Sequence, residues 1–204
     1  MNQSGYSAFN GLRDEELMLQ LQSGREQAFN LIVQRYRPRL YNYLIRYTRN
    51  HEDTEDLIQE TFIRLYRSRN AYEPVARFST WLFTIAGNLM RTHFRKQNRW
   101  QLFSIDDDAQ DSTYIPEIPC VESSPESTVH SEMAYALIQK VFDAMPDDYS
   151  SLLMLREVNE MSYEEIAMIS GLPMGTVKSR INRGRIKAQQ IFKEMNDESL
   201  IYAA

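Results

Sequence analysis

Apolar residues recur at helical spacing along most of the chain, and the strict alternation that is typical of β-strands is scarce. The pattern favours amphipathic helices throughout. Asp14 is expected to cap the first of them, because a short acidic side chain precedes the periodic stretch. The helical stretches predicted are about residues 14–23, 26–47, 53–67, 80–98 and, with a pause at 145–148, 131–195. The expected fold class is all-α.

Residues 101–127 break this pattern and differ sharply in composition. They contain acidic residues and three prolines but no Lys or Arg. Such a segment cannot bury enough apolar surface to fold by itself. We therefore expect two small helical domains, 14–100 and 128–195, joined by a flexible acidic linker, 101–127.

The chain has 204 residues and one cysteine, Cys120, which excludes an internal disulfide. No stretch approaches 18 apolar residues, so no membrane-spanning helix is expected, and residues 1–16 lack the apolar core of a secretory signal. The three histidines are scattered. A cytoplasmic protein with no metal and no cofactor is the expectation.

A formal net charge of −5 argues at first against nucleic-acid binding, but the charge is unevenly distributed. No Asp or Glu lies between Glu73 and Asp106, or between Glu165 and Glu194, and both segments contain several Lys and Arg residues. Two basic segments in an acidic chain favour local contacts with phosphate. The alternative is that both are solvated helix faces, although such faces usually mix the two signs of charge.

Residues 162–187 have the pattern of a helix-turn-helix. Ser162 and Glu165 match a capping box, and Gly171 can adopt the positive φ that ends the first helix. The inner face of the second helix is expected to comprise Val177, Ile181 and Ile186. Its outer face carries polar and basic side chains suited to a major groove, Lys178, Ser179, Asn182 and Arg183. A helical hairpin with a purely structural role would not need this outer face.

Aromatic and basic residues interleave between residues 77 and 99. This combination suits single-stranded nucleic acid, because rings stack on unpaired bases while Arg and Lys follow the phosphates. The spacing equally allows Trp81 to be a core residue, and it predicts Leu82 and Ile85 in the core.

These blocks resemble, in order and spacing, the extracytoplasmic-function (ECF) group of the sigma-70 family. The matching sequences are AFNLIVQRYRPRLYNYL, EDLIQETFIRLYR, FSTWLFTIAGN and SYEEIAMISGLPMGTVKSRINRGR. The resemblance implies an alternative sigma factor whose first domain binds bacterial core RNA polymerase and melts the −10 promoter element, and whose second domain recognises the −35 element. It also implies an anti-sigma factor as a partner.

The resemblance assigns roles to matching positions of this chain. The polar face implied to bind core polymerase is Asp53, Asp56, Gln59 and Glu60. The residues implied to contact the −10 strand are Phe78, Trp81, Asn88, Arg91, Arg95 and Lys96. Those implied to contact the −35 element are Thr176, Lys178, Ser179, Arg180, Asn182 and Arg183. Gly184 departs from the family, which commonly has Ala at that position.

Two other classes of protein are alternatives to this interpretation. A conventional helix-turn-helix regulator would bind duplex DNA without polymerase, but it would need a receiver or ligand domain, and residues 14–100 show no βαβ alternation. An enzyme is disfavoured because the sequence contains no G-x-x-x-x-G-K, H-E-x-x-H or G-x-S-x-G motif.

Overall fold

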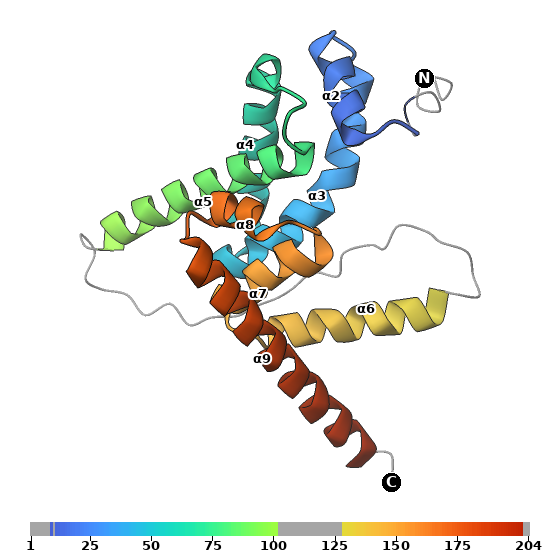
Figure 1. Ribbon diagram of the computed structural model, residues 1–204, viewed down its shortest axis with the longest axis vertical. Coiled ribbons are helices and arrows are strands. Elements are labelled where there is room, and N and C mark those ends of the chain that lie inside the picture. The colour runs from blue at the N-terminus through green and yellow to red at the C-terminus, as the bar shows by residue number, and fades with distance from the viewer. Residues whose placement is uncertain (1–8, 10, 102–127, 202–204) are drawn as a thin grey trace. The chain divides into compact units, whose positions relative to one another are not determined.

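The computed structural model describes residue 9, residues 11–101 and residues 128–201. All regular structure in these ranges is helical, as expected for an all-α chain (Figure 1). The helices are α2 (Asp14–Gln22), α3 (Glu26–Thr48), α4 (His51–Arg67), the 3₁₀ turn η1 (Arg69–Ala71), α5 (Phe78–Gln101), α6 (Thr128–Asp143), α7 (Asp147–Leu153), the π-helical turn η2 (Met154–Val158), α8 (Tyr163–Ser170) and α9 (Met174–Ile201). The predicted linker lies outside the described residues from residue 102 to residue 127.

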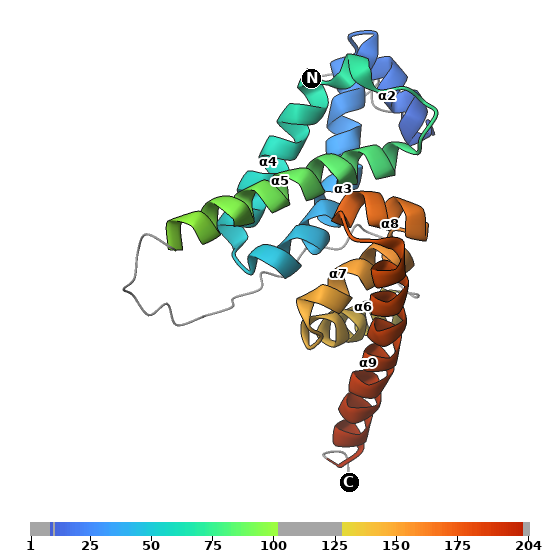
Figure 2. The ribbon, with the colours of Figure 1, turned by 60° about the vertical axis from the view of Figure 1, so that its left-hand side comes forward.

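The chain divides into two compact units, one with α2–α5 and one with α6, α7, α9 and most of α8. In the N-terminal unit, α3 packs against both α2 and α4, and α5 packs against α4 (Figure 2). Each helix buries one apolar stripe, as the helical period requires. Fully buried side chains of this core include Leu17, Leu21, Ile32, Leu40, Leu44, Leu65, Phe78, Leu82 and Phe83.

The start of α2 differs from the sequence prediction. Asp14 is not the N-cap, which is Arg13; the backbone N–H of Arg13 donates to Glu16 Oε2 over 2.8 Å. The Asp14 carboxylate instead accepts hydrogen bonds from Arg35 Nη1 (2.7 Å) and Tyr36 Oη (2.6 Å) on α3. A charge-assisted bond is about twice as strong as a neutral one, so contacts with α3 outweigh capping here.

Helix α4 begins two residues earlier than predicted because of its cap. Asn50 is the N-cap, and its side-chain Oδ1 accepts from the backbone N–H of Asp53 over 3.1 Å. This satisfies one of the otherwise unpaired N–H groups of the first turn. The apolar side chains that α4 buries are Leu57, Ile58, Phe62 and Leu65.

The helix-turn-helix of the C-terminal unit is confirmed in its local details. The Ser162 hydroxyl accepts from the Glu165 N–H, the Glu165 carboxylate accepts from the Ser162 N–H, and Gly171 has φ of 72°. Val177 and Ile181 are fully buried. Ile186, however, is 51% exposed, so its prediction as an inner residue is wrong.

The inner stripe of α9 passes through Gly184 rather than Ile186. Gly184 is buried against α7, with Tyr149 and Met145 as its neighbours. Residues 177, 181 and 184 are separated by four and three positions and therefore share a face, which residue 186 does not. Helix α9 also continues to Ile201, beyond the predicted end near Met195, and no Gly or Pro follows Met195 to stop it.

Gly184→Ala is expected to raise the free energy of unfolding of the C-terminal unit by about 1 kcal/mol, because Ala loses less backbone entropy in a helix. A Cβ at this position would lie 3.5 Å from Tyr149 Cβ and 3.7 Å from Met145 Cε, which is ordinary van der Waals contact. Urea denaturation followed by circular dichroism measures the change.

Gly175→Ala is the comparison variant, since a Cβ there meets no atom within 4 Å and reports helix propensity without packing. A lower urea midpoint for Gly184→Ala beside an unchanged or higher one for Gly175→Ala would contradict the predicted fit.

Candidate nucleic-acid interfaces

The outer face of α9 carries the exposed side chains predicted for DNA contact. Lys178, Ser179, Asn182 and Arg183 are exposed, opposite the buried Val177 and Ile181. Thr176 and Arg180 are half-buried. The exposure of these four side chains confirms the predicted outer face. Their contact with DNA stays a prediction.

Two arginines of α9 pair with carboxylates of the same unit. Arg180 Nη2 lies 3.4 Å from Asp148 Oδ2 of α7, and Arg185 Nη2 donates to Glu157 Oε1 over 2.6 Å. Such solvent-exposed pairs contribute about 0–1 kcal/mol each. The pairs orient guanidinium groups on the surface of the C-terminal unit without neutralising the outer face of α9.

A stacked cluster beside α9 was not predicted from the sequence. The Tyr163 ring has Arg156 Cζ 5.0 Å and Lys178 Nζ 5.9 Å from its centroid, within the range of cation–π attraction. Arg156 is presented by the π-helical turn η2, and its Nη1 also donates to the Met161 carbonyl over 2.6 Å. No sequence motif indicates a π-helical turn, so the proximity of Arg156 to Lys178 follows only from the fold.

The acidic start of α8 is a capping turn. The pKa of the exposed Glu164 carboxyl is lowered, first by its hydrogen bond with its own backbone N–H and then by the Ser162 hydroxyl. Negative charge at a helix N-terminus is stabilising. A structural cause thus accounts for the paired acids Glu164 and Glu165.

In the N-terminal unit, Phe78 is a core residue, and its prediction as a DNA contact is wrong. Its side chain is 0% exposed and packs edge-on against Tyr36 and Tyr72, with ring centroids 5.2 and 5.9 Å away. Interleaved aromatic and basic residues do not reveal which rings are buried. Phe78 instead supports the half-buried Trp81, whose ring centroid lies 6.3 Å away.

Trp81 begins a line of side chains along one face of α5. Asn88 and Arg95 follow at intervals of seven residues, close to two helical turns each, and both are exposed. Asn88 Oδ1 accepts from Arg91 Nη2 over 2.6 Å. Lys96 is exposed and Arg91 half-buried. Leu82 is buried as predicted, whereas Ile85 is only half-buried.

The polar face of α4 lies opposite its buried stripe. Asp56 and Gln59 are exposed, and Asp53 and Glu60 are half-exposed. Glu60 Oε1 accepts from Arg64 Nε over 2.8 Å, and Asp53 Oδ2 lies 3.8 Å from His93 Nε2 of α5. The structure thus presents the four residues together on one surface.

An apolar groove between α3 and α4 adjoins this face and was not predicted. Its volume is about 490 Å³, Phe29, Val33, Phe62 and Ile63 contribute apolar lining, and Gln59 of the polar face also lines it. Ile63 is 43% exposed. The feature of the sequence that could have indicated this groove is Ile63, an apolar residue that lies outside the buried stripe of α4.

Within the described parts of the chain, no helix has the length and apolar character needed to cross a membrane. The same parts contain no group of three or more His, Cys, Asp or Glu side chains that could hold a metal ion.

Comparison with known proteins identifies the family. The model of Sigma-70 region 2 matches residues 32–100, and that of Sigma-70 region 4 matches residues 135–187. The ECF RNA polymerase sigma-E factor of Salmonella typhimurium is 35% identical over 176 residues, which cover 85% of this chain and 91% of that protein. The chain belongs to the ECF group of the sigma-70 family. The resemblance seen in the sequence is thereby confirmed.

Two solved structures share the fold of this chain. The sigma factor RpoE of Bartonella quintana, in complex with the anti-sigma factor NepR, aligns with a TM-score of 0.60 and 25% identity, covering 81% of this chain and 96% of that one. CnrH, in complex with the cytosolic domain of CnrY, aligns with a TM-score of 0.55 and 23% identity, covering 89% and 97%. The latter likeness concerns the fold alone.

Phe78→Ala is expected to lower the free energy of unfolding of this ECF factor by about 3–5 kcal/mol, because it leaves a cavity in the core. Trp81→Ala should cost no more than about 2 kcal/mol, since its ring is only half-buried. Chemical denaturation of both variants, with the wild type as reference, measures the difference. Equal losses would contradict the assignment of Phe78 to the core and of Trp81 to the surface.

Proposed function

We propose that this ECF sigma factor binds bacterial core RNA polymerase in the cytoplasm and directs it to promoters with a −10 and a −35 element. Residues 14–100 would serve as region 2 and residues 128–195 as region 4, joined by the linker 101–127. The chain contributes no catalysis of its own. The observation that carries the proposal is the pair of polar and basic faces, on α5 and on α9, in two separate units.

The polar face of α4 is the proposed site for core polymerase. Asp53, Asp56 and Glu60 supply negative charge, which suits the basic clamp helices that the family resemblance implies on the largest polymerase subunit. The exposed carboxylates would contribute mainly to orientation and to the rate of association, as charges at the rim of an interface do. The neighbouring apolar groove supplies the uncharged surface that a stable interface also needs.

The line of Trp81, Asn88 and Arg95 on α5 is the proposed site for the −10 strand. A half-buried ring can stack on an unpaired base, and each such stack contributes about 1–3 kcal/mol. Arg91, Arg95 and Lys96 would follow the phosphates. Capture of unpaired bases would offset the few kcal/mol needed to unstack them.

The outer face of α9 is the proposed site for the −35 element. Lys178 and Arg183 can donate to guanine, Asn182 can bond adenine, and Thr176 and Ser179 can reach bases or backbone. Arg180 would contact phosphate after leaving Asp148, which costs little for an exposed pair. Polymerase would hold both units at a fixed spacing, so that two weak contacts add through effective concentration.

An anti-sigma factor is the proposed regulator. The RpoE structure from Bartonella quintana and the CnrH structure were both solved as complexes, with NepR and with the cytosolic domain of CnrY respectively. A partner that covers the faces of α5 and α9 would block promoter contact at both elements.

Run-off transcription on fragmented genomic DNA, with bacterial core polymerase present with and without this chain, tests the function directly. New transcripts that start a fixed distance downstream of a shared two-part element are expected. If no transcripts appear and the chain alone shifts duplex DNA, it is a conventional helix-turn-helix regulator instead.

Asp56→Arg is expected to weaken binding to core polymerase by more than about tenfold, because it places a cation against a basic partner. Fluorescence anisotropy of labelled protein measures the affinity. Glu194→Arg is the matched control, since it makes the same change of charge at an exposed position of the other unit. Unchanged affinity of Asp56→Arg would mean that the face of α4 is only solvated.

Arg183→Ala is expected to reduce −35-dependent transcription about tenfold, the effect of one lost base or phosphate contact of about 1–3 kcal/mol. Affinity for core polymerase should stay at the wild-type value. Lys193→Ala, which removes an exposed cation from a later turn of α9, is the control. Equal losses of transcription and of polymerase binding would refute the assignment.

A further inference from the structure

We propose that helix α2 positions the −10 surface, with Glu15 and Gln22 as positioning residues that hold the two ends of segment 69–78. The inference rests on the proposed −10 role of α5. Helix α2 precedes the Sigma-70 region 2 match, which begins at residue 32. The segment connects α4 with α5 and carries Tyr72, on which the Trp81 ring rests.

Glu15 holds the start of α5. Its Oε1 accepts from the backbone N–H of Phe78, the first residue of that helix, over 3.1 Å. The first N–H groups of a helix have no partner inside it, and a carboxylate there also interacts favourably with the helix dipole. The bond joins residues far apart in the sequence, so it fixes where α5 begins relative to α2.

Gln22 holds the other end of the same segment. Its Nε2 donates to the carbonyl oxygens of Arg69 (2.8 Å) and Tyr72 (2.9 Å), at the 3₁₀ turn η1. Both hydrogens of the amide are thereby used. Glu15 and Gln22 are seven residues apart and therefore lie on one face of α2.

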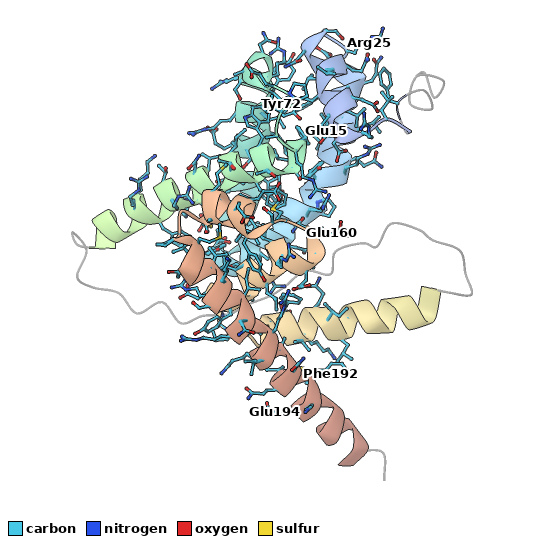
Figure 3. All side chains as sticks on the ribbon, viewed as in Figure 1. Glu15, Arg25, Tyr72, Glu160, Phe192 and Glu194 are labelled. Atoms are coloured by element: carbon cyan, nitrogen blue, oxygen red, sulfur yellow. The ribbon has the colours of Figure 1, made fainter. Side chains whose placement is uncertain are left out.

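The held backbone supports the rings of the −10 surface. Tyr72 is 4% exposed, and its hydroxyl donates to the Ala76 carbonyl over 3.2 Å. Its ring centroid lies 5.1 Å from that of Trp81, and Phe78 lies behind both rings. Figure 3 labels Glu15 and Tyr72 in this part of the N-terminal unit. The two residues anchored by α2, Tyr72 and Phe78, are thus the two that support Trp81.

Helix α2 has contacts with the rest of the unit besides these two polar ones. Leu17, Met18 and Leu21 are almost fully buried, and Asp14 bonds to Arg35 and Tyr36 of α3. Apolar burial of this extent is sufficient to dock the helix. Glu15 and Gln22 therefore fix the orientation of segment 69–78, which burial of the apolar side chains of α2 alone would not specify.

Transcription by holoenzyme tests the proposal on the promoter found by the run-off experiment. The measured quantity is the ratio of initiation from the intact promoter to initiation from one with an altered −10 element. Glu15→Ala is expected to lower this ratio about fivefold, the effect of one hydrogen bond, and Gln22→Ala, which removes two, by at least as much. The corresponding ratio for an altered −35 element and the affinity for core polymerase should stay unchanged.

Two variants separate positioning from general damage. Glu15→Gln keeps an oxygen acceptor for the Phe78 N–H and should stay within about twofold of wild type. Gln20→Ala changes the same residue type on the same helix, away from segment 69–78, and should have no effect. Parallel loss of the −10 ratio, the −35 ratio and polymerase affinity would overturn the proposal, as would equal effects of Gln20→Ala and Gln22→Ala.

Trp81 fluorescence gives a readout that does not depend on sigma activity. In a Trp100→Phe background Trp81 is the single tryptophan. Glu15→Ala and Gln22→Ala should shift its emission to longer wavelength and increase quenching by acrylamide, because the ring loses its support. An unchanged spectrum would overturn the positioning role, whereas a changed spectrum without any transcription by the wild type would refute the proposed function alone.

Discussion

Burial of the Phe78 ring is the interaction on which the N-terminal unit depends. The ring packs on Tyr36 of α3 and on Tyr72, while the backbone N–H of the same residue is bonded to Glu15 of α2. Tyr36 is in turn bonded to Asp14, and burial, followed by that bond, raises its pKa far above the usual range. Phe78 thus links the packing of α2 and α3 to the start of α5. The same packing determines how much of the Trp81 ring is exposed.

Charge is organised by face rather than by domain. The chain is acidic overall, yet the outer face of α9 has Lys178 and Arg183, and α5 has Arg95 and Lys96. Basic faces of this size support weak contacts with phosphate, and an acidic remainder limits non-specific binding. This distribution suits a protein whose DNA contacts become effective when a larger partner holds its two units on one promoter.

The helix-turn-helix was predictable in detail because its signals are local. Ser162, Glu165 and Gly171 each act within a few residues, so their roles can be inferred from spacing alone. The inner face of α9 was predicted less well. Gly184 carries no hydrophobic signal, although it occupies the buried position, and the apolar Ile186 was assigned in its place. The cap of α2 was missed because Asp14 bonds to side chains of another helix.

The sequence by itself determined the helical class, the family and the polar outer face of α9, since periodicity, motif order and capping are properties of neighbouring residues. Only the tertiary structure decided that Phe78 is core, that Arg156 and Lys178 share the Tyr163 ring, and that Glu15 and Gln22 bond segment 69–78. These contacts join residues that lie on different structural elements. Burial and hydrogen bonding between such residues depend on how the helices pack, which no local pattern specifies.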